Sequence, residues 1–223
     1  ISLQGWKALE EVFISGNTKL SSVIGLEDLQ QLLNLAIVRN TVESVGTIRG
    51  SPRLLTLDLT QNHLSQLPVF GELPALRNLD ASNNKLQIVS VLPANLEEVN
   101  FSQNPLIDLD GLDGLPTLRN LSLDHILGDG LSSLSRIGDL PSLEELSLTN
   151  NKFRDVTSLL KFTKLKTLFL DGNHIEDLSP LSTLDDLIYL QAINNPLKDT
   201  SCHFEKAECR FSLFPSLTMA TTR

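Results

Sequence analysis

The sequence predicts an α/β solenoid, with a parallel β-sheet on the concave face and short helices or 3-10 turns on the convex face. A leucine pattern that recurs about every 22 residues is the first observation behind this prediction. The second is composition: leucine occurs 47 times and asparagine 16 times in 223 residues, whereas Trp, Tyr and Met occur once each. A core built almost entirely from one residue type indicates one environment repeated many times.

Charge and hydrophobicity exclude several classes of protein. The chain is 41% hydrophobic, which excludes wholesale disorder, and no apolar run approaches the 18 residues of a membrane-spanning helix. The net charge is −9. Because binding to a phosphate backbone requires clustered Lys and Arg, nucleic acid is not the expected partner.

The repeat follows the pattern LxxLxLxxNxL. Clear copies are LLTLDLTQNHL at 54–64 and LKTLFLDGNHI at 165–175. The first copy carries one extra residue, and the sixth has Ile126 where the others have Asn. We number positions within a copy from its first Leu. Nine copies begin at residues 9, 32, 54, 76, 96, 118, 143, 165 and 187.

This pattern resembles that of the leucine-rich repeat family. Further apolar residues recur at positions 11, 14, 17 and 20, as in Ile175, Leu178, Leu181 and Leu184. That spacing is similar to the 22-residue subclass found in protein phosphatase-1 regulators, dynein light chains and bacterial internalins. The resemblance implies a curved, right-handed leucine-rich-repeat horseshoe over residues 9–197.

The two ends must cover the terminal cores of such an array. Residues 1–8 are the expected N-terminal flank or cap, and Trp6, Val12 and Phe13 are candidates to close the core there. Residues 198–223 are the expected C-terminal cap, which is similar to the short cap of many intracellular 22-residue repeats. Its apolar set is Phe204, Phe211, Phe214, Pro215, Leu217 and Met219.

The asparagine at position 9 is expected to be structural. It lies in the turn after each strand, where its amide can donate to and accept from backbone groups that would otherwise be buried unpaired. Stacked copies then form an Asn ladder. Its members are Asn17, Asn40, Asn62, Asn84, Asn104, Asn151, Asn173 and Asn195.

Positions 2, 3, 5, 7 and 8 are predicted to point onto the concave face, where nothing in the repeat fixes their identity. Ten acidic and four basic residues fall there, a net charge of −6. This acidity favours a basic partner, unless exposed strand positions are simply polar. The residues we expect to contact a partner are Phe13, Asp58, Asp80, Glu98, Asn100, Asp124, Glu145, Phe169, Asp171, Tyr189 and Gln191.

The aromatic pair is the more selective signal on this face. Phe169 and Tyr189 fall on adjacent strands near Ile188 and Ile193. Such a cluster resembles an interface anchor, and the alternative is that the C-terminal cap covers it.

The sixth copy is irregular and runs 25 residues to the start of the next copy. This irregularity indicates either a partner site or a tolerated loop.

The sequence contains no recognisable catalytic motif. Asp58 and Asp80 occupy the same position in neighbouring copies and could bind a cation, but the pattern supplies no third ligand. Cys202, His203 and Cys209 could supply three zinc ligands, without a fourth at a zinc-like spacing. The two cysteines could also form a disulfide. We favour two reduced thiols, because secreted disulfide scaffolds have a denser cysteine framework.

The sequence therefore predicts a non-enzymatic protein–protein interaction module without cofactor or metal. The resemblance implies a cytoplasmic regulatory or scaffold subunit of the phosphatase-regulator or axonemal and cytoskeletal type. The alternative is a bacterial internalin-like surface or effector protein that binds a host protein, a class that DLSPLSTLDDL at 177–187 also resembles. A third reading is an RNA-associated repeat protein like the spliceosomal A-prime protein, which the acidity disfavours. The expected partner surface is basic, or mixed basic and apolar.

Overall fold

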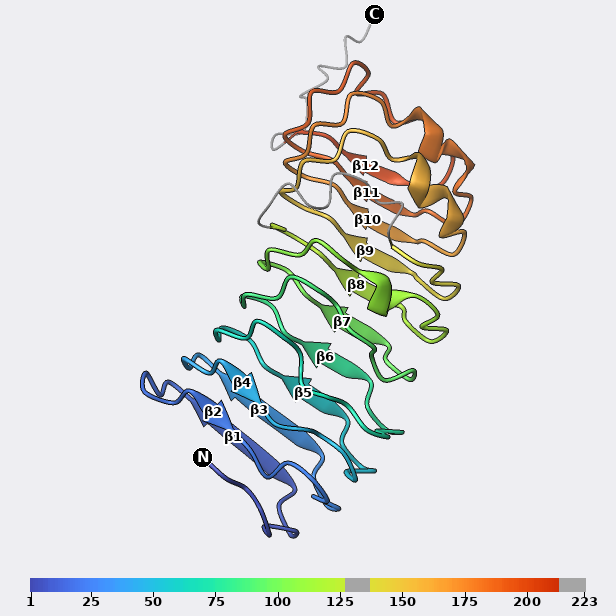
Figure 1. Ribbon diagram of the computed structural model, residues 1–223. Coiled ribbons are helices and arrows are strands. Elements are labelled where there is room, and N and C mark those ends of the chain that lie inside the picture. The colour runs from blue at the N-terminus through green and yellow to red at the C-terminus, as the bar shows by residue number, and fades with distance from the viewer. Residues whose placement is uncertain (127–136, 213–223) are drawn as a thin grey trace, which may run out of the picture.

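The computed structural model describes residues 1–126 and 137–212. The successive copies stack along one axis, with β1 near one end of the stack and β12 near the other (Figure 1). One ten-stranded sheet runs through the stack in the order β1-β3-β5-β6-β7-β8-β9-β10-β11-β12, and its neighbouring strands are parallel. The predicted leucine-rich-repeat solenoid is confirmed.

Nine of the ten strands begin at position 3 of a predicted copy. The second residue of each of these strands points into the core, so that Leu57, Leu79 and Val99 stack in register and are buried. The nine strands are β1 (Glu11–Ser15), β3 (Asn34–Val38), β5 (Thr56–Asp58), β6 (Asn78–Asp80), β7 (Glu98–Asn100), β8 (Asn120–Ser122), β9 (Glu145–Ser147), β10 (Thr167–Phe169) and β11 (Tyr189–Gln191).

The core repeats with the same period. In the copy that begins at residue 165, every apolar position is at most 7% exposed. Each buried leucine contributes roughly 2 kcal/mol relative to an exposed one, so identical layers add up along the stack. The residues of this layer are Leu165, Leu168, Leu170, Ile175, Leu178, Leu181 and Leu184.

The convex face differs between the two halves of the chain. Its C-terminal half has the expected 3-10 turns, η1 (Asp110–Leu112), η3 (Thr157–Lys161) and η4 (Ser179–Thr183). Its N-terminal half is extended instead, with β2 (Ser22–Val23) parallel to β4 (Ser44–Val45) and further single bridges such as Ile48 with Phe70. No α-helix occurs in residues 1–126 and 137–212, so the expected short helices are replaced by 3-10 turns and extended chain.

The position-9 asparagines connect neighbouring copies. The side-chain Nδ2 of Asn84 donates to the carbonyl oxygens of Leu59 and Ala81 at 2.9 and 3.1 Å, and its Oδ1 accepts the Leu64 N–H at 3.0 Å. Asn62 makes the equivalent bonds. Six ladder residues are buried, whereas Asn17 is exposed and Asn195 is half-buried at the ends. The amides thereby satisfy backbone groups that each turn would otherwise bury unpaired.

At the N-terminal end, the expected closure by aromatic residues is wrong. Trp6 is 62% exposed and Phe13 is 74% exposed, and of the three candidates Val12 alone is buried. Leu3 and Leu9 pack against the core instead. Phe13 stands at a strand position that faces away from the core, which explains its exposure.

At the C-terminal end, the cap adds a tenth strand, β12 (Glu208–Arg210), which pairs with β11. Phe204 and Phe211 pack against the core from this segment, whereas the predicted contributions of residues 213–223 lie outside the described residues. Cys202 and Cys209 form a disulfide, so the prediction of two reduced thiols is wrong. The bond closes a short loop that ends in β12, and it removes both thiols from any zinc site.

Candidate functional site: the concave face

The centre of the concave face is a polar hollow of about 300 Å³. It lies over five neighbouring strands, β5 to β9. The parallel register places position 3 of each copy beside position 3 of the next, and position 5 beside position 5. Among the described residues, four carboxylates line the hollow and no basic residue does. Its polar lining is Thr56, Asp58, Asn78, Asp80, Glu98, Asn100, Asn120, Ser122 and Glu145.

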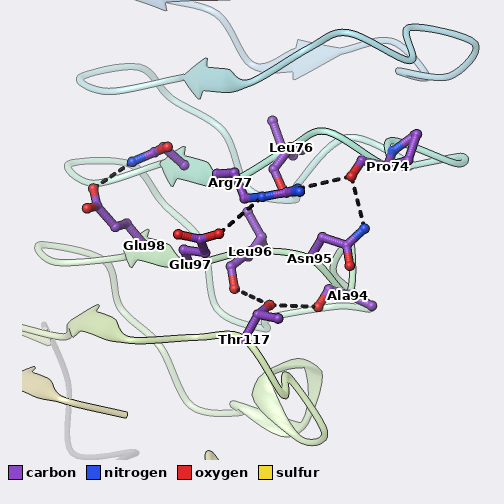
Figure 2. A network of polar contacts seen from close by, with 10 residues as sticks. Pro74, Leu76, Arg77, Ala94, Asn95, Leu96, Glu97, Glu98 and Thr117 are labelled. Atoms are coloured by element: carbon purple, nitrogen blue, oxygen red, sulfur yellow. Dashed lines mark hydrogen bonds and ion pairs between the residues drawn. The ribbon is translucent and has the colours of Figure 1, made fainter. Parts of the chain in front are cut away.

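Two of the three acids at position 2, at the margin of this face, are neutralised by bases of neighbouring copies. Arg77 Nε lies 3.2 Å from Glu97 Oε1 (Figure 2). Lys166 Nζ lies 2.9 Å from Glu144 Oε2, and Arg119 also pairs with this carboxylate. The hydrogen bond from Lys166 is the main cause that lowers the pKa of Glu144 from its ordinary value. These residues therefore add little net charge to the face.

The acids inside the hollow have only neutral hydrogen-bond donors. Asp58 accepts the Thr60 N–H at 2.9 Å, and Asp80 accepts the side-chain amide of Asn100 at 3.0 Å. Glu98 accepts the side chain of Asn78 at 2.6 Å, a contact visible beside the Arg77–Glu97 pair in Figure 2. In the part of the chain that the structure describes, none of these acids or Glu145 forms an ion pair. Their negative charge is thus available to a ligand.

The carboxylates of Asp124 and Asp171 accept hydrogen bonds from the backbone and side chains of the next copy. Asp124 Oδ1 accepts the Thr149 N–H at 2.7 Å and the Ser147 hydroxyl at 2.6 Å. Asp171 Oδ1 accepts the Ile193 N–H at 2.7 Å, and its other oxygen accepts the Gln191 amide. Each aspartate therefore joins its copy to the next, a structural role at two positions predicted to contact a partner.

The aromatic pair lies near the C-terminal end of the face. The Phe169 and Tyr189 rings are 5.7 Å apart at an interplanar angle of 55°, and both residues are half-buried. The Tyr189 hydroxyl donates to Gln191 Oε1 at 2.8 Å. Ile188 is 54% exposed beside them, but Ile193 is buried and does not belong to an exposed cluster.

Position 8 is constrained by the backbone, and the expectation that nothing fixes its identity is wrong. In all nine copies this residue has a positive φ, between 49° and 73°. This left-handed conformation favours Gly and Asn over residues with larger side chains. The nine residues are Gly16, Arg39, Gln61, Asn83, Gln103, His125, Asn150, Gly172 and Asn194.

Two contributions to the surface were missed by sequence reasoning. β12 places Glu208 beside Tyr189 and Arg210 beside Gln191, which extends the face beyond the ninth copy. No repeat motif marks this strand, so the signal available was only the short alternation in AECRF at 207–211. The other missed feature is a convex groove between the third and fourth copies.

The described residues contain no group of three or more His, Cys, Asp or Glu that could hold a metal ion. His63, His125 and His174 are all exposed and separate from one another along the array. None of the helices in the described segments is long and apolar enough to span a membrane. The expected partner site in the sixth copy falls largely on residues 127–136, which lie outside the described residues.

Comparison with known proteins agrees with this architecture. A leucine rich repeat family model matches residues 31–86, and no curated protein sequence matches the chain. Internalin C2 from Listeria monocytogenes superposes with a TM-score of 0.62 at 24% identity, over 91% of this chain and 80% of that one. A Leptospira interrogans leucine-rich repeat protein gives 0.57 at 21%, over 92% and 67%. The leucine-rich repeat domain of a Shigella effector gives 0.51 at 21%, over 92% and 82%. These similarities establish the fold, a leucine-rich repeat solenoid.

Proposed function

We propose that the chain is a non-enzymatic protein-binding module whose concave face docks a partner with a basic, or mixed basic and apolar, surface. The observation that carries the proposal is the hollow over β5 to β9, where no Lys or Arg of residues 1–126 and 137–212 forms an ion pair with Asp58, Asp80, Glu98 or Glu145. Lys or Arg side chains of a partner would supply the missing cations. Such complementarity raises association rates and selects against acidic partners, nucleic acid included.

The aromatic pair gives this surface a second chemical character. Phe169 and Tyr189 bury apolar area against a partner at little conformational cost, and the Tyr189 hydroxyl is already oriented by Gln191. A partner that engages both regions would present basic residues to the hollow and an apolar segment to the aromatic pair. We therefore keep the predicted contact residues as the proposed interface, except that Asp124 and Asp171 act mainly within the array.

The resemblance to 22-residue repeats supports a regulatory or scaffold subunit of the phosphatase-regulator or cytoskeletal type, working in the cytoplasm. A surface or effector protein that binds a host protein is the second candidate. The observation that favours it is the Cys202–Cys209 disulfide, because disulfides persist in secreted proteins and are rare in the cytosol. An RNA-associated role is the least favoured, since the hollow is acidic.

The proposal is tested by capturing partners from source lysate and then measuring their affinities with purified variants. Asp58→Lys/Asp80→Lys reverses charge in the hollow, and Phe169→Ala/Tyr189→Ala removes the aromatic pair. Asp185→Lys/Asp186→Lys is the matched control, because both residues are exposed in the turn between η4 and β11. We expect each concave double variant to weaken binding at least about tenfold, the effect of roughly 1.4 kcal/mol, and the control to leave binding unchanged.

If every partner keeps its affinity for both concave variants, the proposed interface is wrong. The two candidate settings are separated by blocking free thiols in intact source cells before purification. If Cys202 and Cys209 carry the blocking reagent, they were reduced in the cell, and this result supports the cytoplasmic subunit. If they are joined in a disulfide instead, the result supports the surface or effector protein.

A further inference from the structure

A groove of about 860 Å³ opens on the convex face between the third and fourth copies. Apolar side chains dominate both walls, and three of them are largely exposed: Val69 at 70%, Ile88 at 54% and Val91 at 85%. Exposed apolar residues gathered in one concavity are characteristic of a binding site. The groove is remote from the concave face and plays no part in the function proposed above.

The groove arises from a shortened copy. The third copy places six residue steps between its buried Leu67 and Leu73, whereas the fourth places only three between Val89 and Leu92. Phe70 lies in the longer segment, where it forms a parallel bridge with Ile48 of the second copy. The shorter segment offers no residue equivalent to Phe70, so the convex backbone pairing is interrupted between the third and fourth copies and resumes between Ile88 and Asp108.

Backbone groups on both walls point into the gap. Ile48 donates to the Val69 carbonyl at 3.0 Å, and Gly71 donates to the Ile48 carbonyl at 2.9 Å. In this parallel pattern the N–H and C=O of the intervening residue, Phe70, project to the opposite side, toward the groove.

On the wall formed by the fourth copy, the backbone also pairs on the side that faces away from the groove. Asp108 donates to the Gln87 carbonyl at 3.3 Å, and Val89 donates to the Asp108 carbonyl at 3.0 Å. The N–H and C=O of Ile88 therefore face away from Asp108 and toward Phe70. No backbone hydrogen bond joins 66–71 to 86–93 across the groove in the described chain. Two strand edges thus remain unpaired opposite each other.

We propose that this groove binds an extended peptide segment of a partner protein, which adds a strand between Phe70 and Ile88. The backbone of the segment pairs with the free N–H and C=O groups on the walls, as in other cases of strand addition. Alternate apolar side chains of the segment pack on Val69 and Val91. Of the residues that the structure describes, Lys85 is the only charged one that lines the groove, so the segment carries an acidic residue at the end that contacts Lys85.

Amide hydrogen exchange of the purified protein gives the first test. The N–H groups of Gly71 and Val89 are hydrogen-bonded and serve as matched controls for those of Phe70 and Ile88. We expect Phe70 and Ile88 to exchange at least about tenfold faster than these neighbours, because no group in residues 1–126 and 137–212 accepts a hydrogen bond from their amides. Protection of Phe70 and Ile88 at the level of the controls would mean that the walls are already paired, and it would overturn the proposal.

The second test uses a defined probe, the fluorescent hexapeptide Asp-Val-Thr-Val-Thr-Val. We expect saturable binding below about 1 mM, with at least tenfold slower exchange at Phe70 and Ile88. The same peptide N-methylated at alternate residues should bind at least about tenfold more weakly, because methylation removes the donors that a strand requires.

Variants locate the binding site. Val69→Asp/Val91→Asp should abolish peptide binding without unfolding, since both side chains are largely exposed. The control Ile24→Asp, at a residue that is 53% exposed and lies outside the groove, should leave peptide binding unchanged. Equal binding to wild type and to the groove variant, or no saturable binding at all, would refute strand addition here. Light scattering gives the oligomeric state: a dimer that the groove variant converts to a monomer would identify the occupant as a second copy and overturn the proposal of a partner peptide.

Discussion

Two buried serines differ in whether their hydroxyl groups have a hydrogen-bond partner. Ser51 is fully buried, and its Oγ is the one buried side-chain oxygen or nitrogen without a partner in residues 1–126 and 137–212. It stands at position 20, where other copies have Leu73 or Leu115 in the core. Ser102 is also buried, but its Oγ accepts the Asp124 N–H at 3.0 Å.

Replacing these serines by alanine should therefore have opposite effects on stability. Ser51→Ala removes an unpaired polar group and should raise the free energy of unfolding by about 1 kcal/mol. Ser102→Ala leaves the Asp124 N–H without its acceptor and should lower the free energy by about 1 kcal/mol. Denaturant unfolding of the two variants measures both changes. A loss of stability in both would contradict the assignment of Ser51 as unpaired.

Asp199 gives a prediction about pH. The hydrogen bond from His203, 2.7 Å away, and that from the Ser201 N–H lower the pKa of Asp199 to about 2. Because the folded pKa lies below the value of about 4 in unfolded chains, this contact stabilises the cap above pH 4, and the contribution is lost as pH falls through 2. His203→Ala should raise the pKa of Asp199 toward its ordinary value in an NMR titration of the carboxyl carbon. An unchanged pKa would show that the Ser201 contact dominates.

Within single residues, the sequence predicts burial better than it predicts conformation. The leucines and ladder asparagines could be assigned because each performs the same task in every copy. The positive φ of position 8 could not, because residues as different as Arg39, Gln61 and His125 adopt it. The roles of Asp124 and Asp171 were missed for a related reason, since the groups that donate to their carboxylates come from the next copy along the chain.

At the scale of single elements, the turn η1 is held against the fourth copy by a glycine. A Cβ added to Gly111 would lie 2.0 Å from the Ser90 carbonyl oxygen, whereas one added to Gly114, at a φ of 73°, would contact nothing within 4 Å. We expect Gly111→Ala to cost about 3 kcal/mol through a clash with backbone, and Gly114→Ala to cost about 1 kcal/mol through strain alone. Thermal unfolding of the two variants compares them directly. Equal shifts in Tm would show that η1 moves aside freely.

The strands of the concave sheet could be placed from the sequence, and the convex elements could not. The strands follow LxxLxL, whose buried positions allow one register. On the convex face the same spacing of apolar residues is compatible with a 3-10 turn, as in η4, or with extended chain, as in β4. What decides between them is packing against the adjacent copy, which a pattern within one copy does not encode. β12 was missed because the cap has no repeat.

Across the whole molecule, each strand pairs only with the strands of adjacent copies, so stability is a sum of local interfaces. Leu57→Ala in β5 and Leu168→Ala in β10 each remove a fully buried side chain and should each cost about 3 kcal/mol. Hydrogen exchange should then accelerate near the substituted copy and remain close to wild type at the other end of the array. Uniform acceleration along the sheet would instead mean that the solenoid opens as a single cooperative unit.

The two forms of the convex face determine how the solenoid bends. Strand pairing sets a spacing of about 4.8 Å between turns on the inner face. Where the outer backbone is also paired, as between β2 and β4, we expect equal spacing on the two faces and little bending. Beside η3 and η4 the outer chain is wider than an extended strand, so we expect the sheet to bend more strongly there. A ligand that reaches from the acidic hollow to the aromatic pair would therefore follow a surface that becomes more curved toward β11.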